Sequence, residues 1–414
     1  MNTRRVHPAK VFVRGFGFSE GLEWGLWLAL TVYWIVELDL SITELALLGV
    51  VLELTVILSE TPTGVVADVR SRKQSLLIGQ VLMGASFAWT FAVENIWMLL
   101  ASHALLGFGW TFQSGSDTAW ITDELQGVDR GASSPRGERE ITSDVEQLLL
   151  KRGRVGMLIS LIVGPITIAV GWWQSVRVIG LVLSVAFGAV ALWLAIAMSE
   201  DHFTRGAERG MGLRATLRTG VGVVRSQPRL RKLILVAALL FAAAELFGRI
   251  GYIHLLDSGG LRDLDGSGES LLVLGVLFFA TAIAGLLINT AASRRLEGGQ
   301  DIVRVGGVLL LVASVGGVLA STTSIFVLVG IGFLLQDSVQ EAMYPVMEGW
   351  ANRDAPKEVR ATVHSLVGQT TSMSQIGGAI VLGALAEVTS VQVGLGAATA
   401  LMVCAALVAL RSSV

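Results

Sequence analysis

Long apolar segments recur from near the beginning of this sequence to its end. About 20 apolar residues let a helix cross the hydrocarbon core of a bilayer. By that rule we count twelve spans, with boundaries good to a few residues: 15–37, 44–67, 74–93, 96–119, 154–173, 175–198, 232–256, 269–291, 302–320, 324–348, 361–386 and 391–410. With 53% hydrophobic and only 15% charged residues, the chain of 414 residues is expected to be an all-α, multi-pass membrane protein.

The placement of Lys and Arg predicts the orientation of these spans. Of the 31 basic residues, 28 lie at the two termini, at span ends or in every second connection, and the exceptions are Arg177, Arg249 and Arg262. Cytoplasmic loops carry an excess of Lys and Arg in membrane proteins. We therefore expect both termini to be cytoplasmic and the protein to lie in the cell membrane.

The longest connection, 199–231, divides the spans into six plus six. We expect an N-terminal six-helix bundle at 1–198 and a C-terminal one at 232–414. Within the connection, apolar residues share one helical face and cations lie beside them: Leu213, Leu217, Val221 and Val224, with Arg214, Arg218 and Arg225. This pattern is typical of an interfacial helix on the inner leaflet, although a plain solvated linker fits it equally well.

The two halves contain related short sequences. Gly107-Phe-Gly109 and Gln113 recur as Gly330-Ile-Gly332 and Gln336, at an offset of 223 residues. Both stretches lie in the fourth span of their half, which favours an internal repeat over a chance match.

The connection after the second span carries a charged motif, Gly64-Val-Val-Ala-Asp68-Val-Arg-Ser-Arg72-Lys73. It resembles the signature between the second and third helices of the major facilitator superfamily, and Val69 and Ser71 depart from that signature. The resemblance implies two six-helix bundles and a gate in which Asp68, Arg72 and Lys73 hold the cytoplasmic side closed. The alternative is a stop-transfer cluster of positive charge with an incidental Asp68.

Charged side chains inside the spans predict a cavity. Each costs on the order of 2.5–3.5 kcal/mol at the bilayer centre on insertion scales and so requires an explanation. Apart from those in 44–67, they gather in 15–37, 96–119, 232–256 and 324–348, which the resemblance implies are the cavity-lining helices. The predicted substrate or proton cavity consists of polar and aromatic residues: Glu20, Glu23, Trp24, Trp27, Gln113, Asp117, Glu245, Arg249, Asp337 and Glu341.

Several of these residues allow two interpretations. Glu20 with Trp24 and Trp27 suits an organic cation, or Glu20 lies close enough to the cytoplasmic edge to stay hydrated. Glu245 and Arg249, spaced i, i+4, form either an internal ion pair or a substrate or proton site. Asp337 and Glu341 repeat that spacing without a cation between them, which favours a bound proton.

The fifth span contains Gly164-Pro165, a partial match to the glycine-rich motif of antiporters in the superfamily. It favours a proton-coupled exporter of a small amphipathic or drug-like compound, resembling the drug/proton antiporters. A proton-coupled nutrient importer and a non-transporting scaffold or sensor remain alternatives.

No phosphate-loop or metalloprotease motif is present, and Cys404 is the only cysteine. We therefore expect no enzyme activity, cofactor, metal or nucleic-acid partner. The expected partners are a small-molecule substrate, protons and the lipid bilayer around a monomer.

Overall fold

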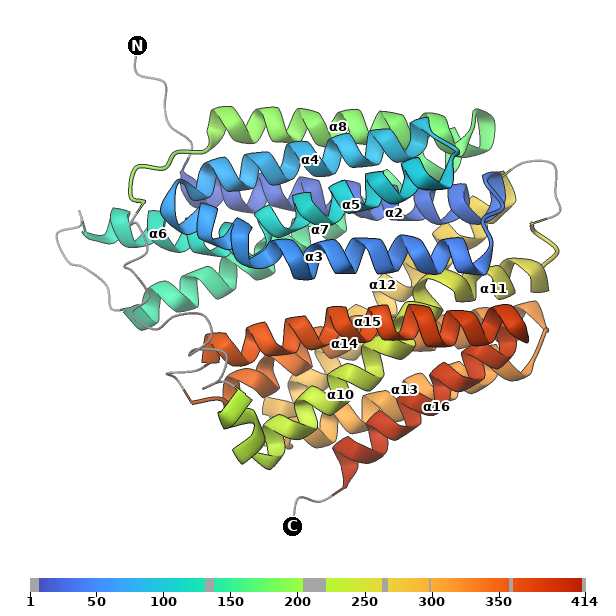
Figure 1. Cartoon of the computed structure of the whole chain (residues 1–414). Coiled ribbons are helices and arrows are strands. Elements are labelled where there is room, and N and C mark those ends of the chain that lie inside the picture. The colour runs from blue at the N-terminus through green and yellow to red at the C-terminus, as the bar shows by residue number, and fades with distance from the viewer. Residues whose placement is uncertain are drawn as a thin grey trace. The chain divides into compact units, whose positions relative to one another are not determined.

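The computed structural model describes residues 7–130, 138–203, 221–262, 267–297, 299–356 and 360–411 (Figure 1). Its named elements within these residues are all helices. Ten of these helices are long and apolar enough to cross a membrane, which confirms the expected all-α, multi-pass class. The other two predicted spans, 15–37 and 96–119, also fall on helical residues, except for the turn at 114–115, and the count of twelve spans stays a prediction.

The first half of the chain contains the following helices, of which the first four follow one another without a gap: α1 (Pro8–Val11), η1 (Phe12–Phe16), α2 (Gly17–Val32), η2 (Tyr33–Glu37), α3 (Ile42–Val69), α4 (Arg72–Ala92), α5 (Ile96–Gln113), α6 (Ser116–Arg130), α7 (Glu138–Trp173) and α8 (Val176–Ala197). The second half contains α10 (Pro228–Glu245), η3 (Leu246–Gly251), α11 (Tyr252–Ser258), α12 (Gly268–Glu297), α13 (Ile302–Thr322), α14 (Phe326–Asp354), α15 (Arg360–Val388) and α16 (Val391–Leu410).

One predicted helix is interrupted. The span expected at 96–119 ends as α5 at Gln113, and α6 begins at Ser116 after a turn. Gly115 in that turn has φ +71°, a left-handed conformation that side chains with a Cβ adopt at a cost. The residues through the turn, Gln113-Ser-Gly-Ser-Asp117-Thr118, are polar and include a glycine, which is typical of a turn, so the prediction of one continuous span was wrong at this point.

The chain forms two compact units. Unit 1 comprises Met1–Leu38, Thr55–Glu208 and Gly266–Gly275, and unit 2 comprises Asp39–Leu54, Arg209–Asp265 and Val276–Val414. The helices α3 and α12 are each divided between the two units, with one segment in unit 1 and the other in unit 2. The predicted bundle boundaries stay a prediction, and most of the predicted interfacial helix lies outside the described residues.

Small residues let the helices within each unit pack closely. In unit 1, a Cβ added to Gly109 of α5 would lie 3.0 Å from the backbone nitrogen of Met83 in α4. In unit 2, a Cβ on Gly332 of α14 would lie 2.6 Å from the carbonyl oxygen of Gly316 in α13. Small residues permit such backbone contact between membrane helices. Gly109 and Gly332 form one of the two glycine pairs in the related short sequences, at the offset of 223 residues.

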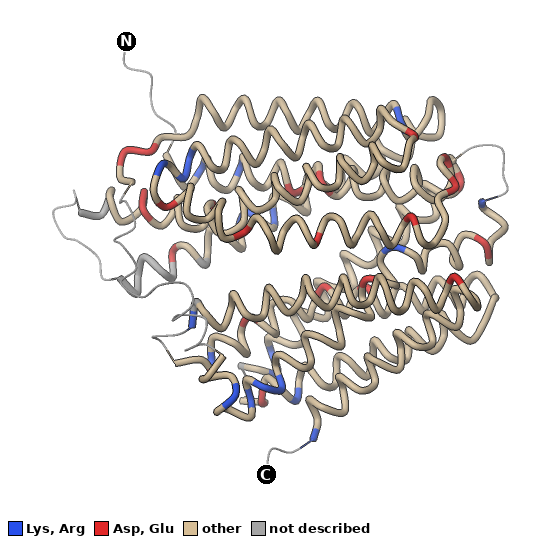
Figure 2. The backbone as a smooth tube through the Cα atoms, viewed as in Figure 1, with Lys and Arg blue, Asp and Glu red and all other residues tan. Residues whose placement is uncertain are grey.

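Charged residues are sparse along most of the helices and frequent at their ends (Figure 2). In unit 2, α10, α13 and α15 begin with basic residues close to their first turns: Arg229, Arg231, Lys232, Arg304 and Arg360. Arg229 forms ion pairs with Asp301 and Asp354, both at 2.7 Å, which joins the starts of α10 and α13 to the end of α14. These contacts tie together one end of the helices of unit 2.

Candidate functional site

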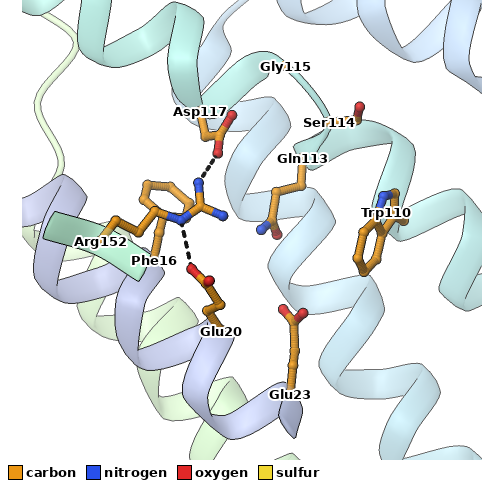
Figure 3. A pocket seen from close by; sticks show the side chains of 9 residues that line it. All are labelled: Phe16, Glu20, Glu23, Trp110, Gln113, Ser114, Gly115, Asp117 and Arg152. Atoms are coloured by element: carbon orange, nitrogen blue, oxygen red, sulfur yellow. Dashed lines mark hydrogen bonds and ion pairs between the residues drawn. The ribbon is translucent and has the colours of Figure 1, made fainter. Parts of the chain in front are cut away.

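A pocket of about 230 Å³ lies within unit 1 (Figure 3). Four of the predicted cavity residues line it, namely Glu20 and Glu23 of α2, Gln113 of α5 and Asp117 of α6. Its remaining lining residues were not predicted: Phe16, Trp110, Ser114, Gly115 and Arg152. The turn between α5 and α6 therefore forms part of the pocket wall.

Arg152 of α7 bridges two of these carboxylates (Figure 3). Its Nε lies 3.1 Å from Oε2 of Glu20, and its Nη1 contacts Oδ2 of Asp117. The guanidinium carbon lies 5.7 Å and 5.8 Å from the ring centroids of Phe12 and Phe16. Charge-assisted hydrogen bonds and cation–π attraction together fix this cation at one end of the pocket.

Glycines bring the bridge together. A Cβ on Gly21 of α2 would lie 2.7 Å from the carbonyl oxygen of Gly156 in α7, and one on Gly17 would lie 3.0 Å from that of Arg152. A Cβ on Gly156 would lie 3.1 Å from the side chain of Glu20. The close approach of α2 and α7 thus depends on residues without side chains and places Glu20 beside Arg152.

Glu23 is the carboxylate of the pocket for which the described residues provide no hydrogen bond or ion pair. It extends from α2 toward Gln113 and Trp110 of α5 in Figure 3. With all groups ionised, three carboxylates and one guanidinium give the pocket an excess of two negative charges. Such a pocket attracts cations, and Trp110 adds an aromatic surface to it.

Gln113 is positioned by a buried chain of hydrogen bonds. The Ser19 hydroxyl donates to Gln80 Oε1 at 3.0 Å, and Gln80 Nε2 donates to Gln113 Oε1 at 2.7 Å. Gln80 is fully buried between α2 and α5. The chain fixes the Gln113 side chain at the pocket wall.

The two predicted tryptophans are not among the residues that line this pocket. Trp27 packs edge-on against Trp34 and Phe87, with ring centroids 6.3 Å apart in both cases. Trp24 lies on the same helix, one residue after Glu23. A direct role of either in binding stays a prediction.

Arg152 is the residue that sequence reasoning missed. It was assigned to a cytoplasmic basic loop because the expected span began at 154, whereas α7 begins at Glu138. Phe16 and Trp110 gave no signal beyond apolar composition. A weak signal for Arg152 was its position one helical turn before Gly156, on the side of α7 that contacts α2.

The predicted gate residues lie together in unit 1. Arg72 Nη2 lies 3.7 Å from Oδ1 of Asp68, whose side chain is 41% exposed. The closer partners of Arg72 belong to α6, since its Nη1 contacts Oδ2 of Asp123 and donates to the carbonyl oxygen of Ala119 at 2.6 Å. The charge cluster therefore exists, but Asp123, which the sequence did not single out, is its better-buried acid.

The other gate residues connect α4 to the segment after α8. Lys73 Nζ donates to the carbonyl oxygen of Met198 at 2.6 Å, and its backbone nitrogen donates to Oε1 of Glu200 at 3.0 Å. The Ser71 hydroxyl binds Glu200 and accepts from the nitrogen of Gln74, which caps α4. A Cβ on Gly64 would meet nothing within 4 Å, so packing does not explain that glycine.

The remaining predicted cavity residues belong to unit 2. Arg249 Nε donates to Oε1 of Glu245 at 2.7 Å, and the side chains are 13% and 7% exposed. The Tyr252 hydroxyl donates to Oδ2 of Asp337 at 2.9 Å, and Glu341 follows Asp337 one turn later on α14. The structure contains the predicted ion pair of Glu245 with Arg249, and it places Asp337 and Glu341 one turn apart. The part of these residues in transport stays a prediction.

The predicted motif of the fifth span lies inside α7. Pro165 lies inside that helix, which continues past it, and a Cβ on Gly164 would meet nothing within 4 Å. Nothing in its surroundings tests the antiporter assignment. Among the described residues, His, Cys, Asp and Glu form no group of three or more that could hold a metal ion.

Comparison with known proteins places this geometry in a family. The family model of the Major Facilitator Superfamily matches residues 15–133 and 153–381. A search of curated proteins found no match.

Solved structures share the fold at low identity. A mutant of nucleoside transporter NupG is 14% identical with a TM-score of 0.74, over 97% of this chain and 99% of that chain. A bacterial homolog of the human lysosomal transporter Spinster is 15% identical with a TM-score of 0.72, over 97% and 96%. A POT family transporter in complex with 5-aminolevulinic acid is 12% identical with a TM-score of 0.71, over 96% and 94%. With the family model matching most of its length, this chain belongs to the Major Facilitator Superfamily.

Proposed function

We propose that this protein is a secondary active transporter that exchanges protons for a small amphipathic cation and exports the cation from the cytoplasm. It would work as a monomer in the cell membrane with both termini cytoplasmic. The single observation that carries the proposal is the carboxylate of Glu23, which lines a pocket with an excess of negative charge and forms no hydrogen bond or ion pair with the described residues.

The chemistry of Glu23 supports an exchange. An unpaired carboxylate inside a membrane protein is costly, and either a proton or a cationic substrate removes that cost. The two cannot occupy the same carboxylate together. Binding of one therefore displaces the other, which is the requirement for coupling an outward cation to an inward proton.

The shape and lining of the pocket support a small amphipathic substrate. Its volume of about 230 Å³ lies below the roughly 300–1,000 Å³ typical of sites for drug-sized ligands. Trp110 and Phe16 offer apolar and cation–π contacts, while Gln113 offers a hydrogen bond. A compact amine with an aromatic or aliphatic body fits these groups.

The test is transport in vesicles that contain the purified protein and a pH-sensitive dye. A panel of small organic cations and neutral amphiphiles is added to vesicles with an imposed proton gradient. The expected result is that one or more cations move against the flow of protons and that Glu23→Gln abolishes this exchange. The matched control is Glu94→Gln, since Glu94 is exposed and pairs with Arg177 away from the pocket.

The alternatives give different results in the same vesicles. Co-movement of a compound and protons in one direction would indicate an importer and overturn the exchange. A protein that inserts correctly but moves no compound of the panel would contradict the proposed substrate class.

A further inference from the structure

The short helix α6 joins the pocket to the gate residues of unit 1. Asp117 in its first turn contacts Arg152 at the pocket. Further along α6, the carbonyl oxygen of Ala119, two residues after Asp117, and the carboxylate of Asp123, six residues after it, both contact Arg72 of the gate motif. The six residues from Asp117 to Asp123 correspond to roughly 9 Å along a helix at about 1.5 Å per residue.

The far end of α6 is fastened to the segment that follows α8. Glu124 is 2% exposed and accepts from the backbone nitrogen of His202 at 3.1 Å. Trp120 Nε1 donates to the carbonyl oxygen of Ser199 at 2.8 Å. A Cβ on Gly127 would overlap the His202 ring, so this glycine provides the space in which His202 sits.

A turn separates α6 from α5. Gly115 has a positive φ, and a Cβ there would meet nothing within 4 Å. The turn makes α6 a separate helix with its own direction. Its apolar side chains Trp120, Ile121 and Leu125 are buried in one cluster with residues of η1, α4 and α7, so α6 is also packed between the pocket and the gate end.

We propose that Arg152 is a positioning residue that transmits the loading of the pocket to the gate through α6. This inference rests on the proposed function and extends it, because it requires that the proton or cation that competes for Glu23 also reaches Asp117, which lines the same pocket. In the unloaded pocket Arg152 forms ion pairs with both Glu20 and Asp117. The ion pair with Asp117 fixes the start of α6.

Loading changes that sharing. A proton or cation at Asp117 removes the attraction between Asp117 and Arg152, which then rests on Glu20 alone. The first turn of α6 is released, and the contacts of Asp123 and Ala119 with Arg72 loosen with it. Neutralising Glu20 acts in the opposite sense, because Asp117 becomes the only pocket carboxylate bridged to Arg152. The two neutralisations therefore predict opposite effects at the gate.

A cysteine reporter at the gate measures this effect without any transport. Ala67 lies near the end of α3, immediately before Asp68 of the gate motif, and is 4% exposed, and cysteine is among the smallest replacements for it. The reporter is Ala67→Cys in a Cys404→Ala background, which leaves a single thiol in the chain. The rate of maleimide labelling in lipid nanodiscs then reports how often the gate end opens.

Asp117→Asn and Arg152→Gln are each expected to raise this labelling rate about tenfold, because each removes one partner of a largely buried ion pair. Glu20→Gln is expected to label at or below the parent rate. Asp117→Glu keeps a carboxylate and is expected to restore slow labelling. An unchanged rate in Asp117→Asn, or equal acceleration in Asp117→Asn and Glu20→Gln, would overturn the proposal.

Two controls separate coupling from loss of structure. Arg177→Gln removes an ion pair of the same unit away from the gate motif and is expected to leave the rate at Ala67→Cys unchanged. A second reporter, Thr90→Cys, lies at a buried position near the other end of α4 and is expected to label slowly in every variant. Fast labelling at both reporters would show general unfolding and contradict a specific role of Arg152. Failure of the vesicle exchange with the labelling pattern intact would reject the proposed substrate or ion but keep the coupling.

Discussion

Arg249 Nε lies 2.7 Å from Oε1 of Glu245, one helical turn away and almost buried within unit 2. The pair neutralises two charges at a position where an unpaired charge is costly. Glu245→Gln alone is therefore expected to destabilise the protein by about 3 kcal/mol, since it removes the carboxylate that accepts the hydrogen bond from Arg249 Nε. The double variant Glu245→Gln, Arg249→Gln is expected to recover most of that loss in thermal unfolding. Equal damage in the single and double variants would indicate separate functional roles.

Gly49 of α3 lies against this pair. A Cβ at Gly49 would overlap Oε1 of Glu245 and lie 3.0 Å from Nε of Arg249. Gly49→Ala is expected to lower the stability by about 1–3 kcal/mol, the usual cost of overpacking. Gly64→Ala in the same helix is the matched control, because nothing lies within 4 Å of its Cβ. It is expected to be neutral or stabilising by up to about 1 kcal/mol. The measurement is thermal melting of both variants in the same detergent. Equal melting temperatures would contradict the close contact between Gly49 and the ion pair.

The two acids beside Arg72 differ in burial. The side chain of Asp123 is 11% exposed and that of Asp68 is 41% exposed. Asp123→Asn is expected to lower the melting temperature more than Asp68→Asn, because exposed ion pairs contribute only about 0–1 kcal/mol. Asp68→Asn is expected to impair transport while the protein still inserts into the membrane. Normal transport by that variant would remove the gating role assigned to Asp68.

The turn at Gly115 predicts a graded response to substitution. Its φ of +71° is accessible to asparagine at small cost and to β-branched residues at a cost of roughly 1–2 kcal/mol. Gly115→Asn is expected to unfold close to the parent temperature, and Gly115→Val is expected to unfold well below it. Similar melting of the two variants would mean that the turn is not held in this conformation.

Class and family were accessible from the sequence because they depend on features spread over the whole chain. The apolar segments and the motif around Asp68 predicted a multi-pass protein of the superfamily, and the family match confirms it. The break at Gly115 was not predicted, although the polar run 113–118 with its glycine is typical of a turn; the positive φ of Gly115 itself depends on backbone geometry rather than on composition.

The site was predictable only in part. Glu20, Glu23, Gln113 and Asp117 were named because charge or polarity inside an apolar span requires an explanation. Arg152 was not predicted as a site residue, because a sequence does not distinguish a cation at the edge of a span from a cation in a basic loop. Arg152 could be identified as a pocket residue only from the contact between α2 and α7. That contact depends on the tertiary packing of Gly21 and Gly156.

Proton release on cation binding tests the central claim most directly. The purified protein in weakly buffered solution is mixed with a small organic cation that it transports in vesicles, and a dye records the pH. We expect the wild-type protein to release protons on binding and Glu23→Gln to bind without release. Binding by the wild-type protein with no proton release, or equal release by Glu23→Gln, would contradict the competition at Glu23 on which the account depends.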